Sequence, residues 1–195
     1  MKAIRQHPGL RRFYWRFEKA LRRLLPRPEA KVLAAISGGL DSVTLAALLA
    51  EARDAGLCPV VFGHVHHGLR ENADRDASFV QELAAAMDIE FTVVRLDLQP
   101  LREREGFSLE QAARAGRHEA LAREAARLDC DAVAMAHHMD DQAETVLVRI
   151  LRGVGPGGLG AMAPSAPMPQ AVASGGRQVM LIRPLLGFRR EAIAA

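Results

Sequence analysis

The sequence is poor in cysteine, and it has no hydrophobic run long enough to cross a membrane. Its two cysteines, Cys58 and Cys130, form no Cys-x-x-Cys pair, so their spacing predicts neither a zinc nor an iron–sulfur site. Reduced thiols of a cytoplasmic protein are the simplest interpretation, although a Cys58–Cys130 disulfide stays open. No stretch of about 18 apolar residues occurs, so we expect no membrane partner. The 195 residues, 49% hydrophobic, suffice for one domain with an appendage.

Positive charge is concentrated at the N-terminus. Residues 1–31 hold ten Lys or Arg and two Glu, a net +8, so the rest of the chain carries −5 of the total +3. The only Trp and Tyr lie in the same segment, at Trp15 and Tyr14. We predict that residues 1–30 form a basic helical segment packed on the domain, with an amphipathic helix over about 10–25. Contact of the arginines with an anionic partner such as RNA stays open.

Strand-like and helix-like patterns alternate along the rest of the chain, over the domain 31–195. We expect strands at 31–36, 59–65, 90–96, 131–136 and 179–183, and helices at 42–55, 74–87, 108–128 and 141–152. This alternation predicts an α/β fold, a doubly wound and mostly parallel five-stranded sheet with helices on both faces. Residues 153–177 are rich in Gly, Pro, Ala and Ser, and we interpret them as a long mobile loop.

The most informative motif is a glycine turn between the first strand and the first helix of this domain, Ser37-Gly38-Gly39-Leu40-Asp41-Ser42. Its glycines permit a sharp turn, and a helix N-terminus with nearby hydroxyls binds anions. A carboxylate here would repel phosphate unless Mg²⁺ lay between them, which makes Asp41 a candidate metal ligand. The alternative is an ordinary turn with Asp41 or Ser42 as a helix cap. The Gly-Lys-Ser/Thr ending of a Walker A loop is absent.

Further polar clusters follow later strands. They are His64 to Arg70, His137 to Thr145, and Arg183 to Leu186. In doubly wound sheets, ligands bind at the carboxyl ends of the strands, so we expect these clusters to converge. Asp141 and Glu144 are either a capping pair or carboxylates that hold Mg²⁺ and meet a substrate. The histidines are either core residues or site residues, and a transition-metal site is disfavoured because soft ligands are missing.

Two arginines lie on the predicted helix 108–128. Helical spacing places Arg114 and Arg117 near each other on one face. They form either a solvated face, paired with Glu110 or Glu119, or a clamp on the phosphates of a nucleotide or RNA.

Taken together, these motifs resemble a known family. Ser37 to Ser42 resembles the pyrophosphate loop of the N-type ATP pyrophosphatases. The combination of His137 to Thr145 with Arg152-Gly153-Val154-Gly155 is similar to the tRNA(Ile)-lysidine synthetases, from about residue 18 onward. The resemblance implies an adenine nucleotide alpha hydrolase-like fold and the use of ATP and Mg²⁺. It also implies a reaction: adenylation of the C2 oxygen of the wobble cytidine in tRNA(Ile) with a CAU anticodon, then displacement of AMP by free L-lysine.

The resemblance, together with the chemistry above, assigns roles to residues. The expected catalytic residues are Asp41, Asp141, Glu144 and Arg183, and Asp41 is also the expected metal ligand. The expected nucleotide-binding residues are Ser37, Gly38, Gly39, Leu40, Asp41, Ser42, His64, Arg114, Arg117 and His137. We expect Asp141 and Glu144 to receive the lysine ammonium, orient it and help remove its proton, and Arg183 or Arg114 to balance charge at the α-phosphate.

Several alternatives stay open at this point. A tRNA 2-thiocytidine-type thiolase, another ATP pyrophosphatase of this superfamily, or a nucleotide-binding module without catalysis would share the loop. Relatives carry C-terminal tRNA-binding domains that this sequence lacks, and the last residues begin a helix without a stop signal. We therefore expect the protein to continue beyond Ala195, and the isolated segment to bind ATP but modify tRNA poorly. A homodimer is left open.

Overall fold

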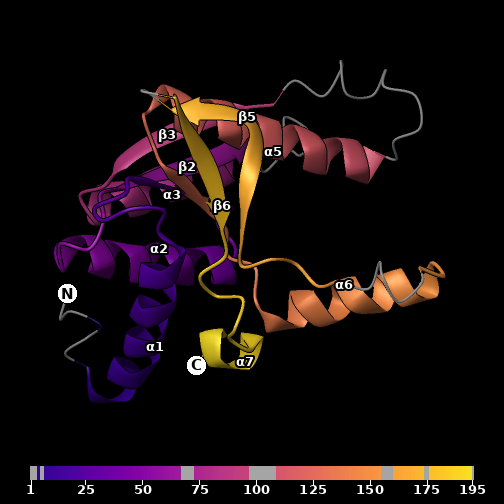
Figure 1. The fold of residues 1–195 in the computed structure, drawn as a ribbon. Coiled ribbons are helices and arrows are strands. Elements are labelled where there is room, and N and C mark those ends of the chain that lie inside the picture. The colour runs from indigo at the N-terminus through magenta and orange to yellow at the C-terminus, as the bar shows by residue number, and fades with distance from the viewer. Residues whose placement is uncertain are drawn as a thin grey trace.

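The computed structural model describes residue 4 and residues 7–66, 73–96, 109–154, 160–173 and 176–194; for 73, 109–114 and 169–173 it describes the backbone alone. These residues form a six-stranded sheet in the order β3-β2-β1-β4-β6-β5 (Figure 1). The strands are β1 (Val32–Ala35), β2 (Val60–His66), β3 (Glu90–Arg95), β4 (Ala132–Ala134), β5 (Ser165–Ala173) and β6 (Arg177–Ile182).

Helices connect the strands. They are α1 (Pro8–Leu24), α2 (Leu40–Asp54), α3 (Ala73–Ala86), α5 (Leu109–Arg127), α6 (Met139–Leu151) and α7 (Arg190–Ala194). Strands β3, β2, β1, β4 and β6 are mutually parallel, while β5 runs antiparallel to β6. No described helix combines the length and the apolar character needed to span a bilayer.

The predicted fold class is confirmed, but the strand count was wrong. The sixth strand, β5, lies within 153–177, where the sequence predicted a loop. Its sequence, Ser-Ala-Pro-Met-Pro-Gln-Ala-Val-Ala, contains two prolines, which cannot donate ladder hydrogen bonds and argue against a central strand. An edge position removes that objection because only one side of β5 is paired, and the register with β6 shifts between Pro167 and Val172.

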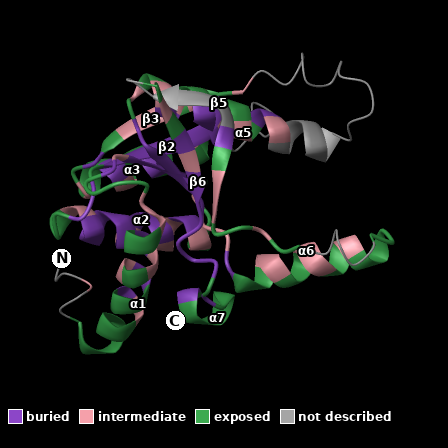
Figure 2. Cartoon of the chain, in the orientation of Figure 1, coloured by how far each residue is buried: buried purple, intermediate pink, exposed green. Residues whose placement is uncertain are grey.

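Two apolar layers cover the sheet. On one face, α1, α2, α3 and α7 pack with residues such as Phe17, Leu45 and Ile182. On the other face, α5 contributes Leu121, which packs with Leu33 and Val133. Helix α6 differs from these helices because none of its residues is buried and it extends away from the sheet (Figures 1 and 2).

Helix α1 packs as its amphipathic pattern predicted. Pro8 stands at its first turn, where the missing N–H costs nothing. Tyr14, Phe17 and Leu21 are buried against the domain, and each such side chain contributes on the order of 1.5–3 kcal/mol. The predicted helix 10–25 and the observed helix Pro8–Leu24 agree closely. The seven residues from Leu25 to Lys31 connect α1 to β1.

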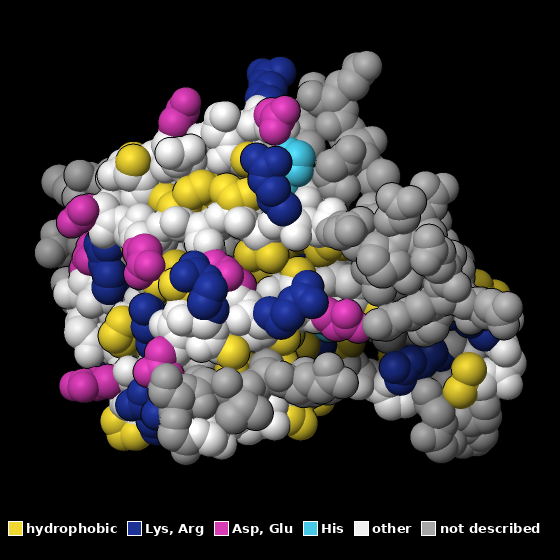
Figure 3. All heavy atoms as spheres, turned by 90° about the horizontal axis from the view of Figure 1, so that it is seen from above, with side chains coloured by type: hydrophobic (Ala, Val, Ile, Leu, Met, Phe, Trp, Pro, Cys, Tyr) yellow, Lys and Arg dark blue, Asp and Glu magenta, His cyan; other side chains and the backbone are white. Residues whose placement is uncertain are grey.

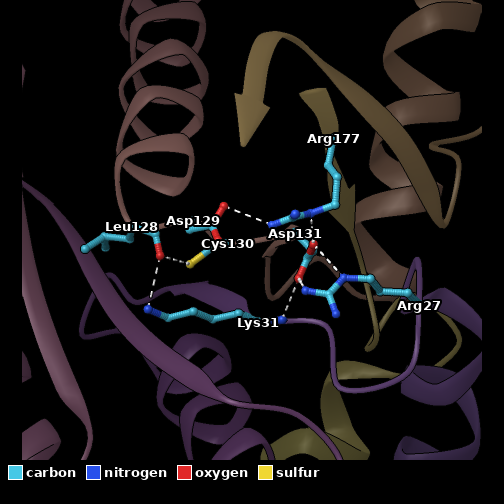
Figure 4. Close-up of polar contacts among 7 residues, drawn as sticks. All are labelled: Arg27, Lys31, Leu128, Asp129, Cys130, Asp131 and Arg177. Carbon is cyan, nitrogen blue, oxygen red and sulfur yellow. Dashed lines mark hydrogen bonds and ion pairs between the residues drawn. The ribbon is translucent and has the colours of Figure 1, made fainter. Parts of the chain in front are cut away.

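A buried carboxylate secures that connection at the amino ends of the strands (Figure 4). Asp131, directly before β4, accepts hydrogen bonds from the Arg27 guanidinium at 2.9 and 2.7 Å, from the Lys31 backbone N–H at 2.9 Å and from Arg177 at 2.9 Å. Burial alone raises the pKa of Asp131, but these hydrogen bonds outweigh it and hold the pKa below its ordinary value. The segment before β1, strand β4 and strand β6 are thereby joined through one side chain.

Candidate functional site

A cleft lies at the carboxyl ends of the parallel strands, which we call the carboxyl edge of the sheet, where the strand order reverses between β1 and β4. Such switch points open a crevice at the carboxyl ends of parallel strands. The cleft has a volume of about 630 Å³. Its lining comes from five segments of the chain. They are Ala35, Ile36, Ser37, Gly39, Asp41 and Ser42 from the end of β1 onward; Gly63, His64 and Val65 of β2; Asp76 of α3; Arg117 and Leu121 of α5; and Met135, Ala136, His137 and Asp141 after β4.

The glycine turn after β1 is held by its own hydroxyls. Ser42 Oγ donates to the Gly39 carbonyl at 2.8 Å and accepts from the Ser37 N–H at 3.2 Å. Ser37 Oγ lies 3.1 Å from Ser42 Oγ. Gly38 has φ +89°, in the left-handed region, where a side chain would be strained. Gly39 is the N-cap of α2 and has no side chain to cap the helix, so the first turn of α2 presents backbone N–H groups toward an anion.

Asp41 stands in that first turn with an oxygen that the described residues leave unused. Its Oδ1 is buried without a hydrogen-bond partner, and its side chain is 27% exposed. Oδ2 lies 3.7 Å from His138 Nε2 and 3.9 Å from Arg190 Nε. A buried carboxylate oxygen without a donor is costly, and such an exception needs an explanation. A cation bound in the cleft would supply one.

The start of α6 faces Asp41 across the cleft. Asp141 Oδ2 accepts a hydrogen bond from the His138 backbone N–H at 2.8 Å, which caps α6. The His138 ring is buried between the two carboxylates, with Nδ1 3.5 Å from Asp141 Oδ2 and Nε2 3.7 Å from Asp41 Oδ2. Asp141 therefore caps the helix, with His138 and not Glu144 as its partner, and it also lines the cleft.

His64 is held in a defined orientation on β2. It is buried, and its Nδ1 lies 2.9 Å from the Ile36 carbonyl oxygen. A carbonyl can only accept, so Nδ1 carries the proton, and Nε2 of the neutral ring is an acceptor. Among the described histidines, His137 also lines the cleft, whereas His66 pairs with Asp74 at 3.0 Å.

Arg183 lies behind the cleft wall. It is buried, donates from Nη1 to the Ala163 carbonyl at 2.6 Å, and places Nε 3.3 Å from His137 Nδ1. Arg183 is not part of the cleft lining, so its contact with the cleft runs through His137.

The remaining predicted residues lie in the cleft lining, outside it, or outside the described part of the chain. Arg117 of α5 lines the cleft, as expected, while the side chain of Arg114 lies outside the described residues. Glu144 is exposed on α6 and Leu40 is 51% exposed, and neither is part of the lining. The predicted residues His67 to Arg70 and Gly155 to Leu159 also fall outside the description.

Sequence reasoning missed two charged residues here. Asp76 of α3 lines the cleft, and Arg190 of α7 reaches Asp41 at 3.9 Å and donates its backbone N–H to Asp140 at 2.7 Å. Their helices meet the cleft only through tertiary packing, and an arginine in a basic tail carries no pattern that distinguishes it. Gln142, within the predicted His137 to Thr145 cluster, has a structural contact: its amide exchanges two hydrogen bonds with the Met162 backbone, at 2.9 and 2.6 Å, and ties the chain after α6 back to the helix.

In the described part of the chain, no three His, Cys, Asp or Glu side chains gather into a preformed metal cage. Mg²⁺ does not need one, because it is commonly held by one or two carboxylates together with phosphate oxygens and water. The unpartnered Oδ1 of Asp41, beside the open start of α2, fits this mode of binding.

The two thiols lie at the amino ends of the strands, which we call the amino edge of the sheet. Cys58 precedes β2 and Cys130 precedes β4, both buried and free. Burial raises the pKa of Cys58 to about 11 and that of Cys130 to about 12. They flank the amino ends of parallel strands, whereas the cleft lies at the carboxyl ends, so neither thiol reaches it.

Comparison with known sequences agrees with these motifs. The PP-loop domain family matches residues 13–195. The tRNA(Ile)-lysidine synthase of Xanthomonas campestris pv. campestris (strain 8004) is 46% identical over 171 residues, covering 86% of this chain and 36% of the relative. That of Bordetella bronchiseptica is 41% identical over 176 residues, covering 90% and 47%. The chain thus spans less than half the length of these two relatives.

Solved structures share the fold at low sequence identity. A tRNA thiolase from Methanococcus maripaludis, solved with its 4Fe-4S cluster, superposes with a TM-score of 0.70 at 18% identity, covering 94% of this chain and 62% of that one. NMN synthetase from Francisella tularensis gives 0.54 at 17% identity, covering 92% and 67%. These likenesses support the α/β architecture, and the family match supports the nucleotide loop. The chain belongs to the PP-loop domain family.

Proposed function

We propose that this chain is the ATP-using catalytic part of a tRNA(Ile)-lysidine synthetase. Its substrates would be ATP, free L-lysine and tRNA(Ile) with a CAU anticodon, and it would act in the cytoplasm. The observation that carries the proposal is that Asp41, from the loop after β1, and Asp141, from the start of α6, line one cleft beside an uncapped helix N-terminus. The similarity to tRNA(Ile)-lysidine synthases over most of the chain supports this activity over those of other enzymes with the fold.

The loop would bind the phosphates of ATP. The N–H groups at the start of α2, together with the hydroxyls of Ser37 and Ser42, offer donors to an anion. When bound, Mg²⁺ would neutralise charge on the departing pyrophosphate, and Asp41 Oδ1 is the ligand available for it. Arg117, which lines the same cleft from α5, adds a cation for a phosphate of the nucleotide. His64 Nε2, held as an acceptor by the bond from Nδ1 to Ile36, is placed to orient a donor group of a ligand.

The reaction has two displacements. In the first, the C2 oxygen of the cytidine attacks the α-phosphorus, the α–β anhydride bond breaks, and pyrophosphate leaves. In the second, the lysine ε-amine attacks C2, the C2–oxygen bond breaks, and AMP leaves with that oxygen. Positioning and charge stabilisation account for most of the acceleration in such reactions.

The chain's own carboxylates would handle the lysine. Its ε-ammonium must lose a proton before it attacks and another afterwards, and a carboxylate in the cleft can receive one. Asp141 is placed for this role because it lines the cleft while its cap to His138 fixes its orientation. Glu144, exposed one turn further along α6, would attract the ammonium from outside the cleft. Arg183, through His137, would keep the wall of the cleft positively polarised near the α-phosphate.

The test is mass analysis of tRNA(Ile) after incubation with the chain, ATP, Mg²⁺ and isotopically labelled lysine. The expected product is a nucleoside heavier than cytidine by one lysine less one water, and its formation should require both ATP and lysine. Pyrophosphate should appear in the same samples. A trace yield that the Asp41→Asn variant abolishes would still support the proposal, since the chain spans only part of its relatives.

The other outcomes identify other functions. Pyrophosphate release that needs no lysine, with sulfur incorporated into the tRNA, would indicate a thiolase. Release with ammonia and a small molecule would indicate another member of the superfamily. ATP binding without release, in the chain and in a longer protein that contains it, would indicate a binding module and contradict the proposal.

A further inference from the structure

The exposed face of α1 is basic along its whole length. Arg11, Trp15, Lys19 and Arg23 follow one another at intervals of four residues and are exposed, and Arg12, Arg16 and Arg22 flank them, also exposed. We call these seven residues the α1 basic face. At 1.5 Å per residue the face extends about 18 Å, which is long enough to follow several phosphates of an RNA strand. The acidic residue in this helix, Glu18, is paired with Arg22 at 2.7 Å.

An aromatic ring stands in the middle of these cations. Trp15 is 59% exposed, and Lys19 Nζ lies 5.2 Å from the centre of its ring. Of the other aromatic residues of α1, Tyr14 and Phe17 are buried under the helix and Phe13 is half-buried. An exposed ring flanked by cations is the arrangement on which unpaired bases stack while their phosphates are neutralised.

The same burial argues against a membrane partner. An amphipathic helix that lies on a bilayer inserts its apolar face into the lipid. Here that face is occupied, because Tyr14, Phe17 and Leu21 have 3% exposure or less and pack on the domain (Figure 2). Only the charged side and Trp15 remain for a partner.

The α1 basic face is connected to the cleft. Arg16 lies over the Phe188 ring at 4.8 Å, and Phe13 packs on Phe188 with ring centroids 4.9 Å apart. The next residues, Arg189 and Arg190, are exposed, and Arg190 reaches Asp41. Cations therefore continue from α1 along the loop before α7 to the mouth of the cleft. By contrast, the face seen in Figure 3 shows Lys and Arg interspersed with Asp and Glu.

We propose that the α1 basic face binds RNA: it holds the backbone of the tRNA substrate while Trp15 stacks on an unpaired base. This inference rests on the proposed function for the identity of the RNA. It assigns the positive charge of the α1 basic face to substrate binding outside the cleft.

The single Trp of the chain allows a direct test. Titration with tRNA(Ile) should quench Trp15 fluorescence, and the affinity should fall steeply as salt rises. The double variant Arg12→Gln with Arg23→Gln should weaken binding on the order of tenfold to fiftyfold at about 0.1 M salt and should lower the salt slope by about two. Trp15→Ala, measured with labelled tRNA, should weaken binding about fivefold or more without changing that slope.

The matched control is Arg123→Gln with Arg127→Gln on α5. These arginines are exposed like the first pair, and α5 packs on the opposite face of the sheet. Equal loss of affinity in both double variants, or an unquenched Trp15 at saturating tRNA, would overturn the inference. A blue shift of Trp15 with anionic phospholipid vesicles that tRNA does not reverse would overturn it in favour of a membrane. Lysidine formation is scored separately, so an absent product with normal quenching would count against the proposed function alone.

Discussion

Two aspartates at opposite ends of neighbouring strands show how the amino and carboxyl edges of this sheet differ. Asp131 precedes β4 at the amino edge, and Arg27, the Lys31 N–H and Arg177 satisfy both of its oxygens. Asp41 follows β1 at the carboxyl edge, and its buried Oδ1 has no hydrogen-bond partner. A carboxylate whose oxygens are all satisfied stabilises the fold, whereas one left unsatisfied can take part in chemistry. We therefore propose that the carboxyl edge is the functional one.

The same contrast holds between the helices that begin at the cleft. Helix α6 uses the carboxylate of Asp141 to cap its first turn, whereas α2 begins at Gly39, which has no side chain. An anion would find N–H donors at the start of α2, whereas an ammonium group would find a carboxylate at the start of α6. Under the proposed function, the start of α2 would therefore bind phosphate and the start of α6 would bind the lysine amine.

The largest expected effect tests the functional edge. Asp41→Asn removes the charge at the orphan oxygen while keeping its shape, and we expect activity to fall about 100- to 1000-fold, as on loss of one group that stabilises a transition state. Asp54→Asn, at the exposed far end of α2, is the control and should be without effect. Pyrophosphate release measures both. Equal rates in the two variants would show that Asp41 is not part of the active site.

The matching change at the structural edge should cost stability in place of activity. Asp131→Asn leaves Arg27 and Arg177 without their common carboxylate, and we expect a loss of about 2–3 kcal/mol in the free energy of unfolding, less than for a fully buried pair because both arginines are partly exposed. Urea denaturation provides the measurement. A loss no larger than that of Asp54→Asn would show that Asp131 is not a structural anchor.

Acid should weaken the same anchor. The folded-state pKa of Asp131 is lowered, chiefly because the hydrogen bonds from Arg27, Lys31 and Arg177 outweigh the effect of burial. Its contribution is therefore complete above the unfolded pKa of about 3.9 and is lost as the pH falls through the lower folded value. Urea midpoints of the wild type and Asp131→Asn should converge as the pH falls below about 4. A constant difference down to pH 2 would contradict this assignment.

A smaller effect is expected within the glycine turn. Gly38→Ala places a Cβ at φ +89°, and we expect it to cost about 1–2 kcal/mol in stability. Gly39→Ala is the matched control, because Gly39 has φ −75° and its new Cβ would come only within 3.6 Å of Ser37 Oγ. Thermal denaturation distinguishes the two. Equal shifts would show that the left-handed conformation is not what requires glycine.

The smallest effect concerns the thiols of the amino edge. Burial raises the pKa of Cys58 to about 11 and that of Cys130 to about 12, so neither should react with a thiol reagent at pH 8 in the folded protein. Both should react once the chain is unfolded in urea. Fast labelling of either thiol without unfolding would mean that this edge opens readily.

The sequence predicted the parts whose signals are local. Apolar runs between helical patterns located the parallel strands to within three residues, and the glycine turn predicted the start of α2 because its residue types serve one geometry. The amphipathic pattern also predicted helix α1, but not that Trp15 would be exposed while Tyr14 and Phe17 are buried. Strand β5 was missed, because its prolines are allowed only at a sheet edge, and an edge is defined by neighbours.

Tertiary structure alone decided how the charged residues divide between the two edges. The sequence determined the class of the sheet, the loop after β1 and the excess of positive charge before it. It did not determine that Arg183 would lie behind His137, that Arg190 would reach Asp41, or that Glu144 would lie outside the cleft lining. Those positions depend on how β4, β6 and α7 pack, and contacts between segments far apart in the chain leave no periodic trace in it.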